Sequence, residues 1–136
     1  VLLQISANTD NAYNNWGGFS LYAYNGRAKN QGSRVSFHRP GGSLFFNWEH
    51  PFIVWAERNG YTLDYAVNYD LELIPGLLEP YRLVLSVGHD EYWSAPMRDA
   101  LCDAIAPASV RRAFRFLRRA AARRSRPPSR GRACAC

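Results

Sequence analysis

The segment from Tyr81 to Val87 restricts the fold of this chain more than any other feature. It is mostly apolar, it ends at Gly88, and a densely polar segment follows it. Short apolar runs bounded by turn-forming residues are typical of β-strands buried inside a sheet. A sheet with buried strands needs cover on both faces, so we expect helices on either side of it.

Strand and helix patterns alternate along the rest of the chain. They are a buried strand at 1–6, a helix within 47–60, a strand at 62–67, a short helical turn within 70–80 and a helix at 94–105. A helical crossover returns the next strand in the same direction, so this order favours a parallel sheet. The sequence predicts an α/β domain with three layers and a mostly parallel sheet.

The two longer helices each carry an apolar face. In the first, Trp48 and Trp55 lie on the same face, and we expect both to pack in the core. In the second, Ser94 is expected to cap the helix, and Met97 and Leu101 lie one turn apart.

Two stretches are expected to contain no helix. Residues 7–11 are rich in turn formers and are predicted to form a polar loop. Residues 19–38 alternate apolar or aromatic residues with small ones and include Asn25-Gly26, which predicts loop and short strands.

The positive charge of the chain lies at its C-terminal end. The net charge is +6, yet residues 1–101 hold seven basic and ten acidic side chains, whereas residues 102–136 hold ten arginines and only Asp103 as an acid. We divide the chain into a partial α/β domain at 1–106 and an Arg/Ala/Pro-rich tail at 107–136. Within the tail, 110–119 is expected to extend as a basic helix, and the rest to be disordered or to come from a shifted reading frame.

Composition excludes several partners and sites. The apolar runs are too short to span a membrane, and the tail lacks a nucleic-acid-binding motif and has few aromatic residues, so nucleic acid is not favoured as a partner. Cys102, Cys134 and Cys136 form no C-x-x-C pair and suggest neither a disulfide framework nor a zinc site. We therefore expect a cytoplasmic protein.

Polar clusters follow each of the three predicted strands. They are residues 8–13, 68–70 and 88–92. Ligands of open α/β sheets bind beyond the carboxyl ends of the strands, and the last cluster is the densest because it holds His89, Asp90 and Glu91. Its alternative interpretation is structural: the carboxylates cap the following helix, and His89 donates to a backbone carbonyl.

Three separated motifs carry a family resemblance. They are SVGHDEYWS at 86–94, N-T-x-x-A-Y-N-x-W-G-G-x-S-L-Y at 8–22 and W-x-E-x-x-G-Y-x-x-D-Y at 55–65. Together they resemble the C-terminal domain of the N,N-dimethylformamidase large (β) subunit family, over residues 1 to about 102. The resemblance implies a fold similar to class I glutamine amidotransferases, which is flavodoxin-like.

The resemblance also implies a mononuclear ferric iron held by two tyrosines and one glutamate. The glutamate corresponds to Glu91, the first tyrosine to Tyr13 and the second to Tyr22, with Tyr24 as the alternative. His89 lies beside the metal as a polar group that does not bind it, so His89 and Glu91 are the expected catalytic residues. Phenolate and carboxylate oxygens suit a hard ferric ion, which favours the ionised phenol.

The activity implied by the resemblance is hydrolysis of a small amide such as an N,N-dialkylformamide. Water and the amide carbonyl would bind at the open positions of the metal, which would polarise the carbonyl and activate the water. His89 would carry a proton to the departing amine. Because residue 1 already lies inside a strand, we expect this chain to be part of a longer subunit, with a small companion subunit as partner.

Two further expectations follow from the apparent truncation. The tail is expected to supply no additional strand, because buried arginines would lack partners. The isolated chain should then be aggregation-prone or partly molten, with little amidase activity, unless the missing C-terminal elements and any companion subunit are restored. The alternative function is a non-catalytic α/β module that binds a ligand or a subunit at the same strand ends.

Overall fold

A parallel β-sheet forms the centre of the molecule. The computed structural model describes residues 1–41, 44–105 and 113–117. Within these residues the sheet has the strand order β2-β1-β3-β4, and every neighbouring pair is parallel. The strands are β1 (Leu2–Ile5), β2 (Asp64–Val67), β3 (Leu83–Val87) and β4 (Ala113–Leu117). The predicted strands in residues 1–6, 62–67 and 81–87 are confirmed.

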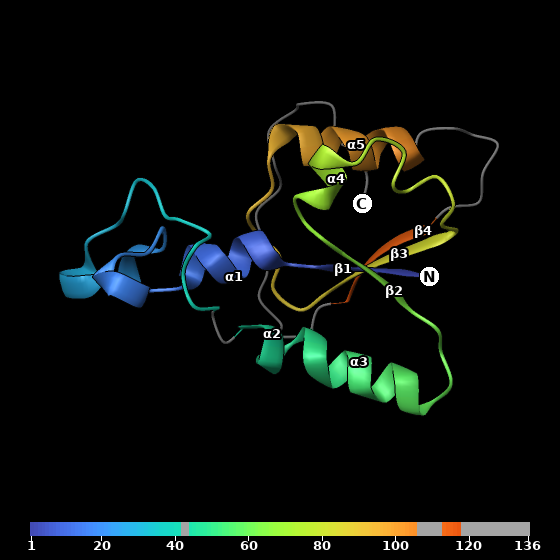
Figure 1. Cartoon of the computed structure of the whole chain (residues 1–136), viewed down its shortest axis with the longest axis horizontal. Coiled ribbons are helices and arrows are strands. Elements are labelled where there is room, and N and C mark those ends of the chain that lie inside the picture. The colour runs from blue at the N-terminus through green and yellow to red at the C-terminus, as the bar shows by residue number, and fades with distance from the viewer. Residues whose placement is uncertain (42–43, 106–112, 118–136) are drawn as a thin grey trace, which may run out of the picture.

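Helices cover both faces of the sheet. They are α1 (Ala7–Tyr13), α2 (Leu44–Asn47), α3 (Glu49–Arg58), α4 (Asp70–Leu73) and α5 (Ala95–Ile105), with short 3-10 turns η1 (Trp16–Gly18), η2 (Ala23–Asn25) and η3 (Arg27–Lys29). Figure 1 shows α2 and α3 on one face and α4 and α5 on the other. The predicted three-layer α/β fold is therefore confirmed. In the described part of the chain, no helix is long and apolar enough to cross a membrane.

The two cores follow the period-two alternation of the strands. Leu2 faces the α4 and α5 layer, where it packs in a cluster with Met97 and Leu101. Its neighbour Leu3 points to the opposite face and joins a second cluster with Leu85 and Val87 that α3 covers. Leu2 and Leu3 are both almost fully buried, so β1 is covered on both faces.

The start of α5 follows the predicted cap. The amide of Met97 donates to Ser94 Oγ at 3.2 Å, which satisfies one of the free amides of the first turn. Met97 and Leu101 are buried on the predicted face. Cys102, also on α5, is disulfide-bonded, which the cysteine pattern did not predict.

Residues 7–13 form helix α1, so the predicted polar loop is wrong. Asp10 lies in the first turn of α1, where a negative charge favours helix formation. Thr9 and Ala12, three residues apart, are buried on one face. Packing of that face therefore outweighs the turn preference of the asparagines.

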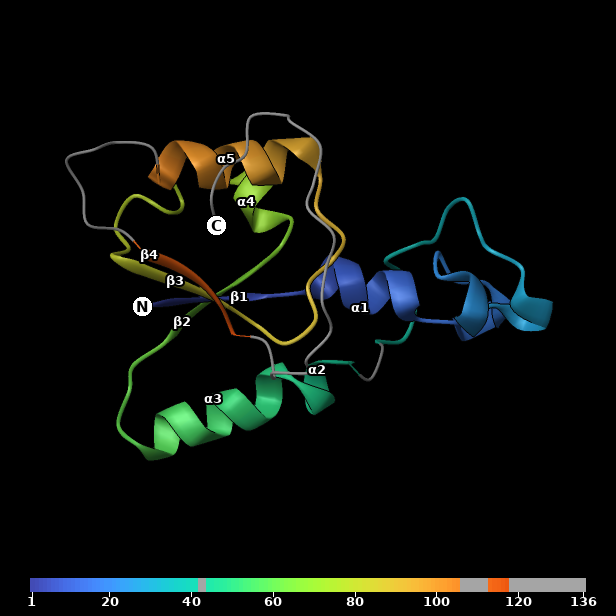
Figure 2. The same ribbon diagram turned by 180° about the vertical axis from the view of Figure 1, so that it is seen from behind.

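The short strands expected in residues 19–38 are also absent. The 3-10 turns η2 and η3 and a single bridge between Ser20 and Gln31 take their place. The Arg39 guanidinium donates to the backbone carbonyls of Asn11, Asn14 and Phe19 at 2.6–3.1 Å, which leaves these groups satisfied without a sheet. Figures 1 and 2 show this segment projecting beyond α1, away from the sheet.

Strand β4 contradicts two expectations about the tail. Residues 113–117 pair with β3 in parallel register, so the predicted basic helix at 110–119 is wrong there, and the tail does supply a strand. The segment reads Ala-Phe-Arg-Phe-Leu, and its aromatic residues at alternate positions favour a strand. The remaining tail residues lie outside the described ones.

The expected core packing of Trp55 is wrong, and that of Trp48 is only partly right. Trp55 is 53% exposed and stacks on Tyr61 at a centroid distance of 5.7 Å. Trp48 is half-buried and lies just before α3. Ala56, which is 1% exposed, and Phe52, which packs against the cluster around Leu3, supply more of the buried face of α3.

Glu49 is a buried carboxylic acid between α3 and β1. It is 2% exposed and accepts hydrogen bonds from the amide and hydroxyl of Ser6, while Oε2 has no partner among the described residues. Burial raises the pKa of Glu49, against the opposing effect of the Ser6 hydrogen bonds. An acid with a raised pKa destabilises the fold when it ionises.

We therefore expect the variant Glu49→Gln to be stabilised relative to the unsubstituted chain at neutral pH. The gain should disappear as the pH falls to the ordinary glutamate value of 4.5, because below it Glu49 is neutral in both the folded and the unfolded state. Urea unfolding across this pH range measures the difference in the free energy of unfolding between the variant and the unsubstituted chain. An equal difference at both ends of the range would contradict the prediction.

Candidate functional site

A chain of buried hydrogen bonds joins the carboxyl ends of β1, β2 and β3. The Asn8 amide, after β1, donates to Asn68 Oδ1 at 3.0 Å. Asn68, after β2, donates through Nδ2 to Asp90 Oδ1 at 3.3 Å. Ser86 Oγ in β3 donates to Asp90 Oδ2 at 2.8 Å. The three polar clusters expected at separate strand ends thus meet at one edge of the sheet.

Asp90 is the buried anchor of this edge. It is 8% exposed, and burial raises its pKa, while hydrogen bonds from Ser86, Asn68, Gln4 and Trp93 act in the opposite direction. Ser86 and Asn68, its partners at 2.8 and 3.3 Å, lie near the ends of β3 and β2. These contacts therefore do not support the structural alternative, in which Asp90 serves chiefly to cap the following helix.

Thr9 fixes the segment that carries Glu91. Its Oγ1 accepts hydrogen bonds from the amides of Glu91 and Tyr92 at 2.9 and 3.1 Å. Thr9 is fully buried on α1, so the turn after β3 is tied directly to the helix after β1. The sequence did not predict this contact. No sequence pattern distinguishes a threonine that accepts hydrogen bonds from two distant amides from a threonine that only packs in the core.

Tyr13, His89 and Glu91 come together at the open side of this edge. Tyr13 Oη donates to Glu91 Oε2 at 2.8 Å, and His89 Nε2 lies 3.1 Å from Tyr13 Oη and 3.2 Å from Glu91 Oε1. Tyr13, at the end of α1, is 76 positions from His89 and 78 from Glu91, which both lie in the turn after β3. His89 thus contacts two side chains rather than the backbone carbonyl of the structural alternative.

The second predicted tyrosine, Tyr22, lies against the first. Its ring stacks on Tyr13 with a centroid distance of 4.6 Å and an interplanar angle of 25°. Tyr24 instead contacts Tyr22, at 5.3 Å, and is 73% exposed. Of the two tyrosines between which the sequence left a choice, Tyr22 has the ring contact with Tyr13.

Electrostatics hold Tyr13 as a neutral phenol in this arrangement. Burial is the largest cause that raises its pKa, followed by the hydrogen bond and the charge of Glu91. Burial and Glu91 also raise the pKa of Tyr92. Two phenols beside a carboxylate therefore keep their protons unless a cation enters, in which case the charge of the cation would favour the phenolate.

The donor set fits a hard cation. Tyr13 Oη and Glu91 Oε2 lie 2.8 Å apart in a hydrogen bond, close enough for one cation to contact both oxygens. Phenol and carboxylate oxygens also have the hardness that a ferric ion prefers. No group of three or more His, Cys, Asp or Glu side chains in the described residues has a metal-binding arrangement. A metal site at this cluster would therefore depend on the tyrosine oxygen of Tyr13 as well.

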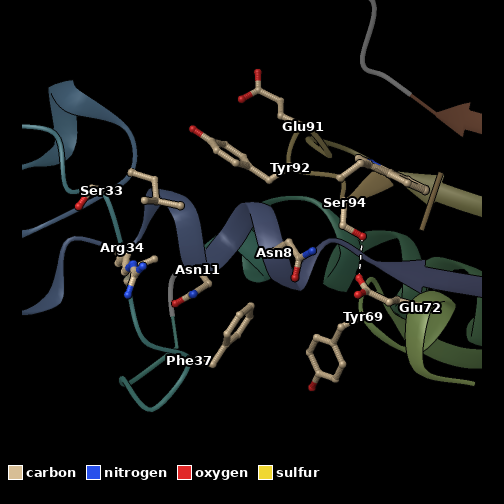
Figure 3. Close-up of a pocket in the computed structure, with 13 residues that line it drawn as sticks. Asn8, Asn11, Ser33, Arg34, Phe37, Tyr69, Glu72, Glu91, Tyr92 and Ser94 are labelled. Atoms are coloured by element: carbon tan, nitrogen blue, oxygen red, sulfur yellow. Dashed lines mark hydrogen bonds between the residues drawn. The ribbon is translucent and has the colours of Figure 1, made fainter. Parts of the chain in front are cut away.

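A pocket of about 890 Å³ opens beside the cluster. Glu91 and Tyr92 line it, together with Asn8 and Asn11 from α1 (Figure 3). This volume lies within the range of small-molecule sites in proteins. The sequence did not predict the part of its wall that comes from the irregular segment before α2, which includes Arg34 and Phe37.

The remaining histidines lie outside this cluster. His38 and His50 are both exposed, and the ring of His50 lies 6.0 Å from that of Phe45.

The model of the family described as N,N-dimethylformamidase beta subunit-like, C-terminal, matches residues 1–108. A search of curated proteins found no match.

Gly88 sets the direction in which the chain leaves β3 toward His89. Its φ is +90°, and a Cβ added there would lie 2.4 Å from Cβ and 2.7 Å from Cγ of Trp48. A side chain cannot yield at its own Cβ, so the start of α3 and the His89 turn would have to move apart. Gly60, by contrast, has φ +78° and nothing within 4 Å of an added Cβ.

We therefore expect Gly88→Ala to destabilise the fold by about 1–3 kcal/mol more than Gly60→Ala, because only the former adds a steric clash. Gly60→Ala should cost about 1 kcal/mol from the left-handed backbone alone. Urea unfolding of both variants gives the comparison. Equal losses would show that Trp48 does not constrain Gly88.

Proposed function

The chain belongs to the N,N-dimethylformamidase beta subunit-like, C-terminal family, and on this basis we propose that it hydrolyses the C–N bond of an amide. The observation that supports this proposal is the cluster of Tyr13, His89 and Glu91, whose polar atoms lie within 3.2 Å of one another beside an open pocket. The family description also supports a domain that acts within a larger, multi-subunit enzyme.

We propose that Tyr13, Tyr22 and Glu91 hold a ferric ion. Their oxygens supply three anionic ligands once both phenols are ionised, which balances the charge of the ion. When bound, the ion supplies Lewis acidity toward an amide carbonyl and an activated water. Of these residues only Glu91 lines the pocket, so a substrate bound there would meet the centre at Glu91.

His89 has the position of a proton carrier. Its Nε2 lies beside both Tyr13 Oη and Glu91 Oε1, and its side chain is about one-third exposed. Hydrolysis requires a water oxygen to add to the carbonyl carbon, and one proton of that water must reach the nitrogen as the C–N bond breaks. His89 Nε2 would accept this proton and deliver it to the leaving amine, which leaves a carboxylic acid and a free amine as products.

Ligand and proton-carrier roles predict different phenotypes. In the full chain loaded with ferric iron, Tyr13→Phe, Tyr22→Phe and Glu91→Gln should each lower bound iron at least about tenfold, and the tyrosine variants should weaken the visible tyrosinate-to-iron band. His89→Ala should keep the iron and the band but slow amine release from N,N-dimethylformamide about 10²–10⁴-fold. Metal analysis, visible spectroscopy and an amine assay give the three readouts.

Tyr24→Phe is the matched control, because its ring lies next to Tyr22 yet is exposed. It should change neither iron content nor the band. Loss of the band in Tyr24→Phe, with Tyr22→Phe unaffected, would make Tyr24 the ligand. A folded protein that takes up no iron but still binds small ligands at the strand ends would instead support the non-catalytic module.

A further inference from the structure

The pocket beside Glu91 is much larger than a dialkylformamide requires, and its far side is aromatic. We propose that the amide substrate carries an aromatic group, which lies against Phe37 and Tyr69 while the amide lies at Glu91. This inference rests on the proposed amide hydrolysis and adds the substrate class of that site. Phe37 and Tyr69 would then be its specificity-determining residues.

The extent of the pocket is the first argument. In Figure 3, Glu91 and Tyr92 lie on one side of α1, and Phe37 and Tyr69 lie on the other. All four residues line the same pocket of about 890 Å³. A helix with its side chains is about 10–12 Å across, so N,N-dimethylformamide is too small to touch both sides at once. A substrate that fills the pocket must extend across the face of α1.

The chemistry of the far side is the second argument. The rings of Phe37 and Tyr69 meet edge to face, with a centroid distance of 5.9 Å and an angle of 78°. Phe37 is 59% exposed and Tyr69 is 42% exposed, so their mutual contact leaves much apolar ring surface in contact with water. A third ring can bury that surface by stacking on one partner or meeting its edge.

Two polar contacts of the wall are already made, although Asn8 Oδ1, which also belongs to the wall, has no partner among the described residues. Asn11 Oδ1 accepts from Arg39 Nη2 at 2.8 Å, and Ser94 Oγ donates to Glu72 Oε2 at 2.7 Å. Such satisfied groups give little reason to bind a highly polar substituent, because a new contact would have to replace an existing hydrogen bond. An apolar ring competes with none of these contacts.

A pair of tertiary formamides tests the proposal, because the scissile group is the same in both. With the iron-loaded full chain, N-benzyl-N-methylformamide should be hydrolysed with a kcat/KM at least about tenfold above that for N,N-dimethylformamide. Phe37→Ala and Tyr69→Ala should each lower the ratio of the two kcat/KM values toward one. Phe46→Ala is the control, since Phe46 is 65% exposed and does not line the pocket.

Binding to the iron-free chain separates this inference from the proposed function. By calorimetry, N-benzyl-N-methylformamide should bind measurably more tightly than N,N-dimethylformamide, and Phe37→Ala should weaken it at least about fivefold. Equal binding of the two amides, or no effect of Phe37→Ala, would overturn the aromatic assignment. Ring-dependent binding with no hydrolysis of either amide by the iron-loaded chain would support the aromatic assignment and overturn the proposed amidase activity.

Discussion

The buried contact between Asn68 and Asp90 is the interaction on which the rest of the site depends. Asn68 connects the ends of three strands, because it accepts from the Asn8 amide and donates to Asp90, which Ser86 also holds. Asn68 is fully buried and Asp90 nearly so, where an unpaired polar group would be costly. The residues that follow these strands therefore have fixed positions relative to one another.

That fixed edge explains how residues far apart in the sequence form one cluster. Thr9 ties the turn after β3 to α1, and α1 carries Tyr13 at its other end. Gly88 and Trp48 set the direction of the same turn from the α3 side of the sheet. Tyr13 therefore reaches Glu91 because helix and turn share an anchor, even though α1 has only seven residues.

Much of the fold follows from local sequence pattern, and the exceptions have physical causes. Apolar runs and caps predicted β1, β3 and α5, because burial and helix punctuation are local properties. Helix α1 was missed because packing of Thr9 and Ala12 outweighs turn propensity, and β4 because arginine content obscured its alternating aromatic residues. Within the candidate site, the motifs pointed to Tyr13 and Glu91, which the structure brings into hydrogen-bond contact, but no local pattern could indicate that Phe37 and Tyr69 meet on one side of the pocket.

Amide hydrogen exchange of Asn68→Ala tests most directly whether the strand ends act as one unit. The exchange rates in Asn68→Ala are compared with those in the unsubstituted chain and in Asn47→Ala, a control at an exposed position. All rates are expressed relative to that of the core amide of Leu85. If the edge is coupled, the amides of Glu91 and Tyr92 will exchange faster together with that of Asn8, although neither contacts Asn68 directly. Faster exchange at Asn8 alone would contradict the coupling.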